Sequence, residues 1–148
     1  MDQKVSTEQP LSPQDCLVAV MIATSASDGN MTSAELLSIT RIIDSLPAFD
    51  GYDADRLQQI SSTVLELFEE EDGLDALFGL IKSALPEDLY ETAYALACDV
   101  VASDRHAEEP ELRLLEEIRD ELALDRLHAA AIERGARARF RSIAPLVG

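Results

Sequence analysis

Apolar residues recur at helical spacing along most of the chain, and this pattern predicts an all-α fold. The stretch 16–23 (CLVAVMIA) is apolar on every side, which is typical of a helix that is buried all round. The following segment places its apolar residues on one helical face, at Leu36, Ile39, Ile42, Ile43 and Leu46. No segment shows the sustained alternation of a β-strand, and no Asn-Gly hairpin turn occurs.

Start and stop signals divide the pattern into about seven helices. Ser12-Pro13 supplies an N-cap followed by proline at the first helical position, and Thr32 with Glu35 has the form of a capping box. Asp53 or Asp55 is expected to begin the third helix, and Asp125 is the expected N-cap of the last helix. The predicted helices run from 13 to about 28, from 33 to 46, from 53 or 55 to 68, from 74 to 85, from 86 past 101, from 109 to about 122, and from about 126 to 140.

The length of 148 residues fits one domain. We expect a disordered N-terminal segment at 1–11, a helical domain at 12–141 and a C-terminal tail at 142–148. Aromatic residues make up only 5% of the chain and tryptophan is absent, which favours helices over strands.

The chain contains an internal repeat. Residues 18–50 align without a gap on a second stretch that lies 76 residues later. Ser27-Asp28 falls on Ser103-Asp104 and Glu35 falls on Glu111. Each copy reads as an apolar helix, an Ala-Ser-Asp corner, and a glutamate in the first turn of the next helix. The repeat therefore predicts two related helical hairpins, each with a carboxylate pair at its corner.

The four repeated carboxylates are candidate metal ligands, because divalent cations such as Ca²⁺ and Mg²⁺ require several oxygen ligands. If the hairpins pack about a pseudo-twofold axis, Asp28, Glu35, Asp104 and Glu111 would converge. Asn30 and His106 occupy matching positions and are auxiliary candidates; an imidazole would widen the choice toward transition metals. The sequence does not specify the identity of such a cofactor.

The segment 25–35 (SASDGNMTSAE) and its later repetition resemble the tellurite-resistance TerB family. The resemblance covers roughly residues 15–140. It implies a compact domain of about seven helices, an acidic cluster that binds metal cations, a bacterial cytoplasmic setting and a link to chemical stress. The second copy departs from the pattern, because Arg105 replaces Gly29 and Ala107 replaces Met31.

A purely structural interpretation of the same carboxylates stays open. Glu35 completes a capping box, and a first-turn carboxylate gains about 0.3–1 kcal/mol from the helix dipole. Asp28-Gly29 is an ordinary turn sequence. In the second copy, however, Glu108 replaces the capping Thr32 and Glu111 is still present. Capping alone does not require a glutamate there.

Charge suggests a second class of function. The chain has 29 acidic and 12 basic residues, with a net charge of −17, so it repels nucleic acid and anionic membranes over most of its surface. Residues 1–104 carry 20 acidic and 4 basic residues, whereas only arginines are charged after Glu133. A protein-interaction module that recruits a basic partner is therefore the alternative to cation binding. The oligomeric state is not indicated.

Motifs of known enzymes are missing from the sequence. There is no phosphate-binding glycine loop, paired CxxC, HExxH or G-x-S-x-G motif, so we do not expect an enzyme. A reaction that uses two carboxylates on a small substrate is a weaker third hypothesis. Cys16 and Cys98 lie in apolar stretches and are expected to be buried small hydrophobes. No signal peptide or apolar run of about 20 residues is visible, so we expect a cytoplasmic protein without membrane insertion.

Overall fold

The computed structural model describes residues 11–103 and 109–143. Within these residues the chain forms seven α-helices and two short 3-10 helices, and it contains no strand. The elements are α2 (Pro13–Ser25), α3 (Ser33–Ser45), η1 (Pro47–Phe49), α4 (Arg56–Phe68), α5 (Gly73–Ala84), η2 (Glu87–Leu89), α6 (Tyr90–Ser103), α7 (Glu109–Glu121) and α8 (Arg126–Arg139). The prediction of a single all-α domain is confirmed.

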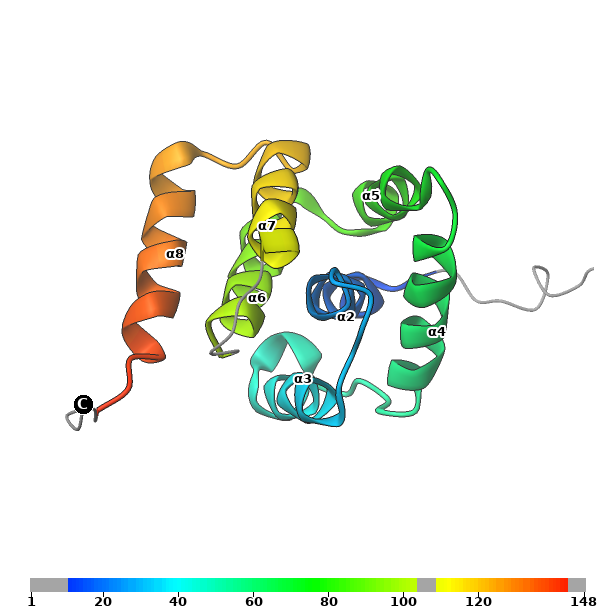
Figure 1. The fold of residues 1–148 in the computed structure, drawn as a ribbon, viewed down its shortest axis with the longest axis horizontal. Coiled ribbons are helices and arrows are strands. Elements are labelled where there is room, and N and C mark those ends of the chain that lie inside the picture. Colours follow the sequence, from blue (N-terminus) through cyan, green and yellow to red (C-terminus); the bar gives the residue numbers. More distant parts are fainter. Residues whose placement is uncertain (1–10, 104–108, 144–148) are drawn as a thin grey trace, which may run out of the picture.

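Helix α2 forms the centre of the molecule, as its apolar sequence predicts. Every residue from Asp15 to Ser25 is buried, and α2 contacts α3, α4, α5, α6 and α7. Figure 1 shows α2 nearly end-on between these helices. A helix without a polar face can be stable only in such a position, because every side of it needs apolar neighbours.

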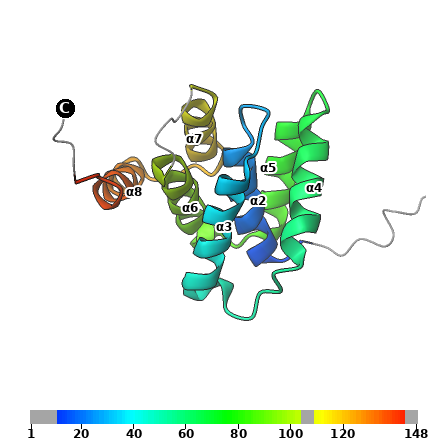
Figure 2. The same ribbon diagram turned by 60° about the horizontal axis from the view of Figure 1, so that its bottom comes forward.

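Helix α6 is the second buried helix and connects the centre to one end of the molecule. It packs against α2, α7 and α8. Helix α8 packs on α6 through Ala129 and Ala136, which are buried, and Ile132, which is partly buried. Figures 1 and 2 show α8 at one end of the molecule, far from α4. The pseudo-twofold relation between the two hairpins stays a prediction.

The capping predictions are confirmed at three helices. Ser12 caps α2, with proline at the first helical position. Thr32 and Glu35 form the predicted capping box of α3. Asp125 caps α8 by accepting a hydrogen bond from the His128 backbone N–H at 3.0 Å. These signals are local, so sequence spacing is sufficient to find them.

Three helix boundaries differ from the prediction. Helix α2 ends at Ser25, before the expected stop at 28, and residues 26–28 form a turn. Helix α4 begins at Arg56, and the Asp55 side chain does not cap it. Instead, Asp53 Oδ1 accepts from the Asp55 backbone N–H at 3.0 Å, which makes a local turn before the helix. Pro86 precedes the 3-10 helix η2, and α6 itself begins at Tyr90.

A buried carboxylate connects α2 to α4. Asp15 is 1% exposed and accepts hydrogen bonds from Tyr52 Oη at 2.7 Å and from Arg56 Nη2 at 2.5 Å. Burial acts to raise the pKa of Asp15, but the hydrogen bonds from Arg56, the Ser12 backbone and Tyr52 outweigh it and hold the pKa below its usual value. The ion pair therefore fixes the start of α2 against α4.

Candidate functional site: an acidic groove

A groove of about 650 Å³ lies where the α2–α3 corner, the α4–α5 turn and the start of α7 meet. Among the described residues, its carboxylates are those of Glu70, Glu71, Glu109 and Glu117, and the one cationic side chain that lines it is Arg113. Its other lining residues are Ala26, Ser27, Gly29, Phe68, Leu74, Pro110 and Leu114. Ala26 and Leu114 are buried, whereas Glu70, Glu71 and Glu109 are exposed. The groove thus combines an apolar base with an acidic rim.

The first wall is the corner after α2. The Gly29 backbone N–H donates to the Ala26 carbonyl at 2.9 Å, which closes the turn. Gly29 has a φ of +90°, a conformation that side chains with a Cβ rarely adopt. The sequence prediction of a glycine turn at this corner is therefore confirmed, although the helix itself stops earlier.

The second wall is the turn between α4 and α5, which holds two of the carboxylates. The Glu70 N–H donates to the Leu67 carbonyl at 2.9 Å, and the Glu70 carbonyl accepts from the Gly73 N–H at 3.1 Å. A Cβ on Gly73 would lie 1.7 Å from the Leu67 carbonyl oxygen. Only glycine fits this approach, so Gly73 fixes the path of the turn that presents Glu70 and Glu71.

The third wall is the first two turns of α7. Glu109, Arg113 and Glu117 follow one another at intervals of four residues, so they share one helical face. Arg113 Nη2 lies 3.6 Å from Glu109 Oε2, and both side chains are mostly exposed. Such a surface pair contributes little, about 0–1 kcal/mol.

Charge in the groove is unbalanced. Four carboxylates and one guanidinium of the described residues line it. Among the residues that the structure describes, Glu70, Glu71 and Glu117 make no ion pair. A ligand that brings positive charge would therefore find acceptors that are not already engaged.

Asp28 and Glu35, two of the predicted metal ligands, each bind nearby backbone. Asp28 Oδ1 accepts from the Asn30 N–H at 3.0 Å, which explains Asn30 as part of a local turn. Glu35 Oε1 accepts from the Thr32 N–H at 2.9 Å, and Thr32 Oγ1 accepts from the Glu35 N–H at 3.1 Å. Both carboxylates thus have a structural role in helix capping or turn formation.

The equivalent residues of the second copy are in a different position. Glu111 is in the first turn of α7, as predicted, but it is 1% exposed, whereas Glu35 is partly exposed. Asp104 and His106 lie outside the described residues. Within 11–103 and 109–143, no group of three or more His, Cys, Asp or Glu residues is arranged to hold a metal ion. The convergence of all four repeated carboxylates stays a prediction.

The first corner and the start of α7 do contribute to one groove, through other residues. Ala26, Ser27 and Gly29 come from the first corner, and Glu109 and Pro110 come from the start of α7. The acidic run 69–72 is easily taken from sequence for a solvated helix end. Its place in the same groove as Glu117 depends on tertiary packing. The one local sequence signal of the groove is the four-residue spacing of the charged residues on α7.

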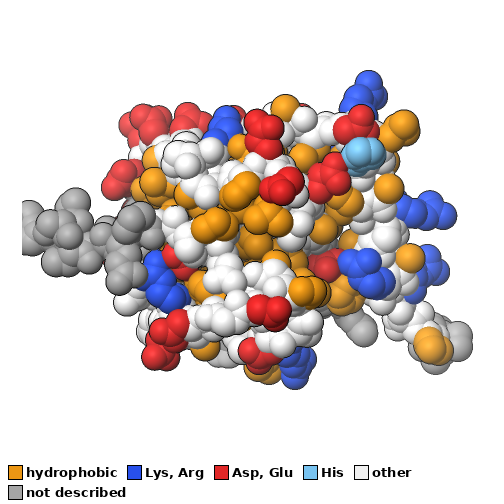
Figure 3. Space-filling view, turned by 180° about the vertical axis from the view of Figure 1, so that it is seen from behind, with side chains coloured by type: hydrophobic (Ala, Val, Ile, Leu, Met, Phe, Trp, Pro, Cys, Tyr) orange, Lys and Arg blue, Asp and Glu red, His pale blue; other side chains and the backbone are white. Residues whose placement is uncertain are grey.

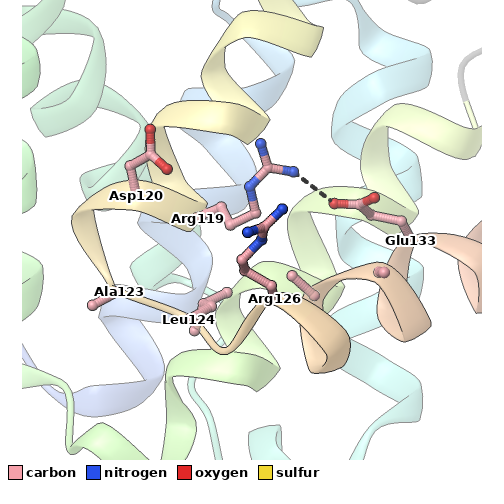
Figure 4. Close-up of a pocket in the computed structure, with 8 residues that line it drawn as sticks. Arg119, Asp120, Ala123, Leu124, Arg126 and Glu133 are labelled. Atoms are coloured by element: carbon pink, nitrogen blue, oxygen red, sulfur yellow. Dashed lines mark hydrogen bonds and ion pairs between the residues drawn. The ribbon is translucent and has the colours of Figure 1, made fainter.

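A second cavity, of about 510 Å³, separates α7 from α8. Figure 4 shows Arg119 and Arg126 side by side in it, and Glu133 Oε2 accepts from Arg119 Nη1 at 3.1 Å. Asp120 also lines this cavity, so two guanidiniums are balanced by two carboxylates. Tyr94 donates its hydroxyl hydrogen to Glu133 as well. These contacts attach α8 to α6 and α7, and we assign them a structural role.

Both cysteines are buried and free, as predicted. Burial raises the pKa of Cys16 to about 11 and that of Cys98 to about 12. Neither sulfur is a thiolate at neutral pH, so neither has the properties of an activated nucleophile. In the described parts of the chain, no helix is long and apolar enough to cross a membrane.

Comparison with known proteins adds no further constraint. No family model, curated protein or solved structure matches this chain. The resemblance to the TerB family therefore stays a prediction.

Proposed function

We propose that this protein is a non-enzymatic interaction module that binds a basic, partly apolar protein segment in the acidic groove. The observation that carries the proposal is the combination of an apolar base with three rim carboxylates, those of Glu70, Glu71 and Glu117, that make no ion pair with any described residue. Apolar contacts supply most of the affinity of such a site, and the carboxylates select lysine or arginine and orient the segment.

The groove favours a segment with at least one bulky apolar side chain and two or three basic residues. Phe68, Leu74 and Leu114 offer the apolar contact, and Glu70, Glu71 and Glu117 offer the charges. An amphipathic helix laid along α7 would meet both requirements, as in other helix-in-groove complexes.

A peptide titration tests the proposal. A fluorescein-labelled amphipathic helical peptide, with leucines on one face and arginines on the other, is titrated with the protein. Its fluorescence anisotropy is recorded at low and high salt. We expect binding that weakens as salt rises, because the carboxylates are at an exposed rim. The variant E70Q/E71Q/E117Q should bind at least tenfold more weakly and show a smaller salt dependence.

The matched control removes three carboxylates elsewhere. Asp44, Glu87 and Asp88 are exposed and do not line the groove, so D44N/E87Q/D88N makes the same change in net charge. This variant should bind as the wild type does. Equal weakening by both triple variants would show a general charge effect and would contradict binding in the groove.

Divalent-cation binding through Asp28, Glu35, Asp104 and Glu111, with a link to tellurite or other chemical stress, is the second proposal. It is supported by the doubled sequence corner and by the resemblance, whereas the backbone contacts of Asp28 and Glu35 favour structural roles. Thermal melts with Ca²⁺, Mg²⁺, Mn²⁺ and Zn²⁺ distinguish cation binding from a purely structural role of these carboxylates. A metal at 100 times its Kd stabilises a protein by about 2.7 kcal/mol. That shift, lost in D28N/D104N, would support the cation site.

A further inference from the structure

Helix α8 is a basic helix on an acidic protein. Residues 126–141 contain five arginines and one glutamate, whereas the whole chain has a net charge of −17. Figure 3 shows Lys and Arg side chains along the edge that α8 forms. The molecule is therefore strongly dipolar, and its basic pole is a single helix.

The inner face of α8 is fully occupied. Ala129 and Ala136 pack on α6, and polar side chains form pairs along the same helix–helix contact. These pairs join His128 to Glu91, Glu133 to Tyr94 and Arg139 to Asp99. Because each pair joins α8 to α6, the orientation of α8 about its own axis is fixed.

The outer face of α8 and the residues just after it carry arginines that make no ion pair among the described residues. Arg134, Arg137 and Arg141 are exposed, and none of them has an ion-pair partner in the part of the chain that the structure describes. Together with Phe140 they line a hollow of about 510 Å³. Leu127, on the first turn of α8, is 80% exposed.

This outer face is defined by Arg134 and Arg137 of α8 and by Arg141, which follows the end of the helix, and it matches the acidic groove in charge. Its three guanidiniums correspond to the three groove carboxylates Glu70, Glu71 and Glu117, and none of the six groups has an ion-pair partner within the described residues. Phe140 supplies the bulky apolar side chain that the groove base favours.

One molecule cannot make this contact with itself while α8 stays docked on α6. Figures 1 and 2 show α8 at one end of the molecule and the α4–α5 connection at the other. We propose that the outer face of α8 docks in the acidic groove of a second copy of this chain. The inference rests on the proposed function, because it names the basic segment that the groove binds.

Such a contact joins two different surfaces, so a docked pair leaves one groove and one α8 face unoccupied. Heterologous contacts of this kind build rings or open chains. The net charge of each copy opposes association at low salt, whereas the contact charges are screened at high salt. With a Debye length of about 8 Å at 0.15 M salt, the long-range repulsion between copies is weakened more than the attraction between charges in direct contact. Association should therefore be strongest near physiological salt.

Analytical ultracentrifugation over a range of protein concentrations tests the inference. The wild type should form oligomers near about 0.15 M salt and dissociate near about 1 M salt. R134Q/R137Q/R141Q keeps the groove, E70Q/E71Q/E117Q keeps α8, and each variant alone should stay monomeric. An equimolar mixture should form 1:1 dimers and nothing larger, since only one intact groove and one intact α8 can meet.

The outcomes separate this inference from the proposed function. If R134Q/R137Q/R141Q binds the basic peptide but the wild type stays monomeric at every concentration and salt, self-docking is wrong and the groove proposal stands. If that variant does not bind the peptide, the groove proposal fails. Oligomers that persist in both variants, or an acidic peptide bound by the α8 face of a monomeric wild type, would also overturn self-docking.

Discussion

Tyr94 on the buried helix α6 donates its hydroxyl hydrogen to Glu133 on α8, which also accepts from Arg119 on α7. One carboxylate thereby connects three helices. Burial, together with the hydrogen bond to Glu133, raises the pKa of Tyr94, so the phenol keeps its proton at neutral pH. The position of α8, and with it the direction of its arginines, depends on this contact.

Removing the Tyr94 hydroxyl should loosen α8. Tyr94→Phe deletes a hydrogen bond to a charged group, which contributes about 1.5–3 kcal/mol. We expect the free energy of unfolding in urea to fall by about 1–2 kcal/mol, because Arg119 still binds Glu133. Tyr90→Phe is the control, since the Tyr90 hydroxyl makes no hydrogen bond within the described residues. A loss as large in Tyr90→Phe would contradict a specific role for Tyr94.

Asp15 should be the polar residue whose replacement costs most. In Asp15→Asn the amide nitrogen faces donors from Tyr52 and Arg56, and the guanidinium loses its counter-charge. We expect a loss of roughly 2–4 kcal/mol in urea unfolding. Asp44→Asn, an exposed carboxylate, should change stability by less than about 0.5 kcal/mol.

The cost of Asp15→Asn should depend on pH. The pKa of Asp15 is lower in the folded protein than in the unfolded chain, so its contribution is complete above the ordinary pKa of about 3.9. It is lost as the pH falls through the folded pKa. The difference in stability between the wild type and Asp15→Asn should therefore be constant at pH 5–7 and shrink in strong acid. A difference that stays constant into strong acid would contradict the ion pair.

The sequence predicts the fold where local chemistry decides it. The capping box of Thr32 and Glu35 and the all-apolar segment 16–23 each depend on neighbouring residues, so spacing alone places α3 and α2. Contacts across the fold are not visible in this way. Asp15 and Arg56 are 41 residues apart, and nothing in either segment shows that they pair.

The candidate site follows the same division. The repeat correctly indicates a glutamate in the first turn of both α3 and α7, because that pattern is local. It does not indicate that Glu111 is buried while Glu35 is partly exposed, since burial depends on which helices pack over each corner. Nor does it place Glu70 in the same groove as Glu117, because the α4–α5 turn reaches α7 only through packing around α2.

The His128–Glu91 pair should make α8 docking dependent on pH. His128 Nδ1 lies 2.7 Å from Glu91 Oε2, and this hydrogen bond and charge raise the pKa of His128, with a smaller effect from Asp125. A raised pKa gives a contribution that is complete below the unfolded value of about 6.5 and is lost as pH rises through the folded value.

We therefore expect the wild type to exceed His128→Gln in thermal stability by more at pH 6 than at pH 9. In a Glu91→Gln background the main cause of the shift is absent, so replacing His128 should then have nearly the same effect at both pH values. If the stability advantage of the wild type grew toward pH 9 instead, folding would lower the pKa of His128 rather than raise it, which would contradict this prediction.

Two glycines on α5 should respond to alanine in opposite directions. A Cβ on Gly73 would lie 1.7 Å from the Leu67 carbonyl oxygen, so Gly73→Ala must move the α4–α5 turn. We expect a loss of at least about 1–3 kcal/mol, as for other overpacked positions. Gly79 has no neighbouring atom within 4 Å of such a Cβ, so Gly79→Ala should stabilise the helix by about 0.5–1 kcal/mol.

The same pair of variants tests whether the α4–α5 turn positions the groove carboxylates. Gly73→Ala should weaken binding of the basic peptide even at temperatures where the variant is fully folded, because Glu70 and Glu71 move with the turn. Gly79 does not line the groove, so Gly79→Ala should bind as tightly as the wild type. Unchanged peptide affinity in folded Gly73→Ala would show that the groove does not depend on the path of this turn.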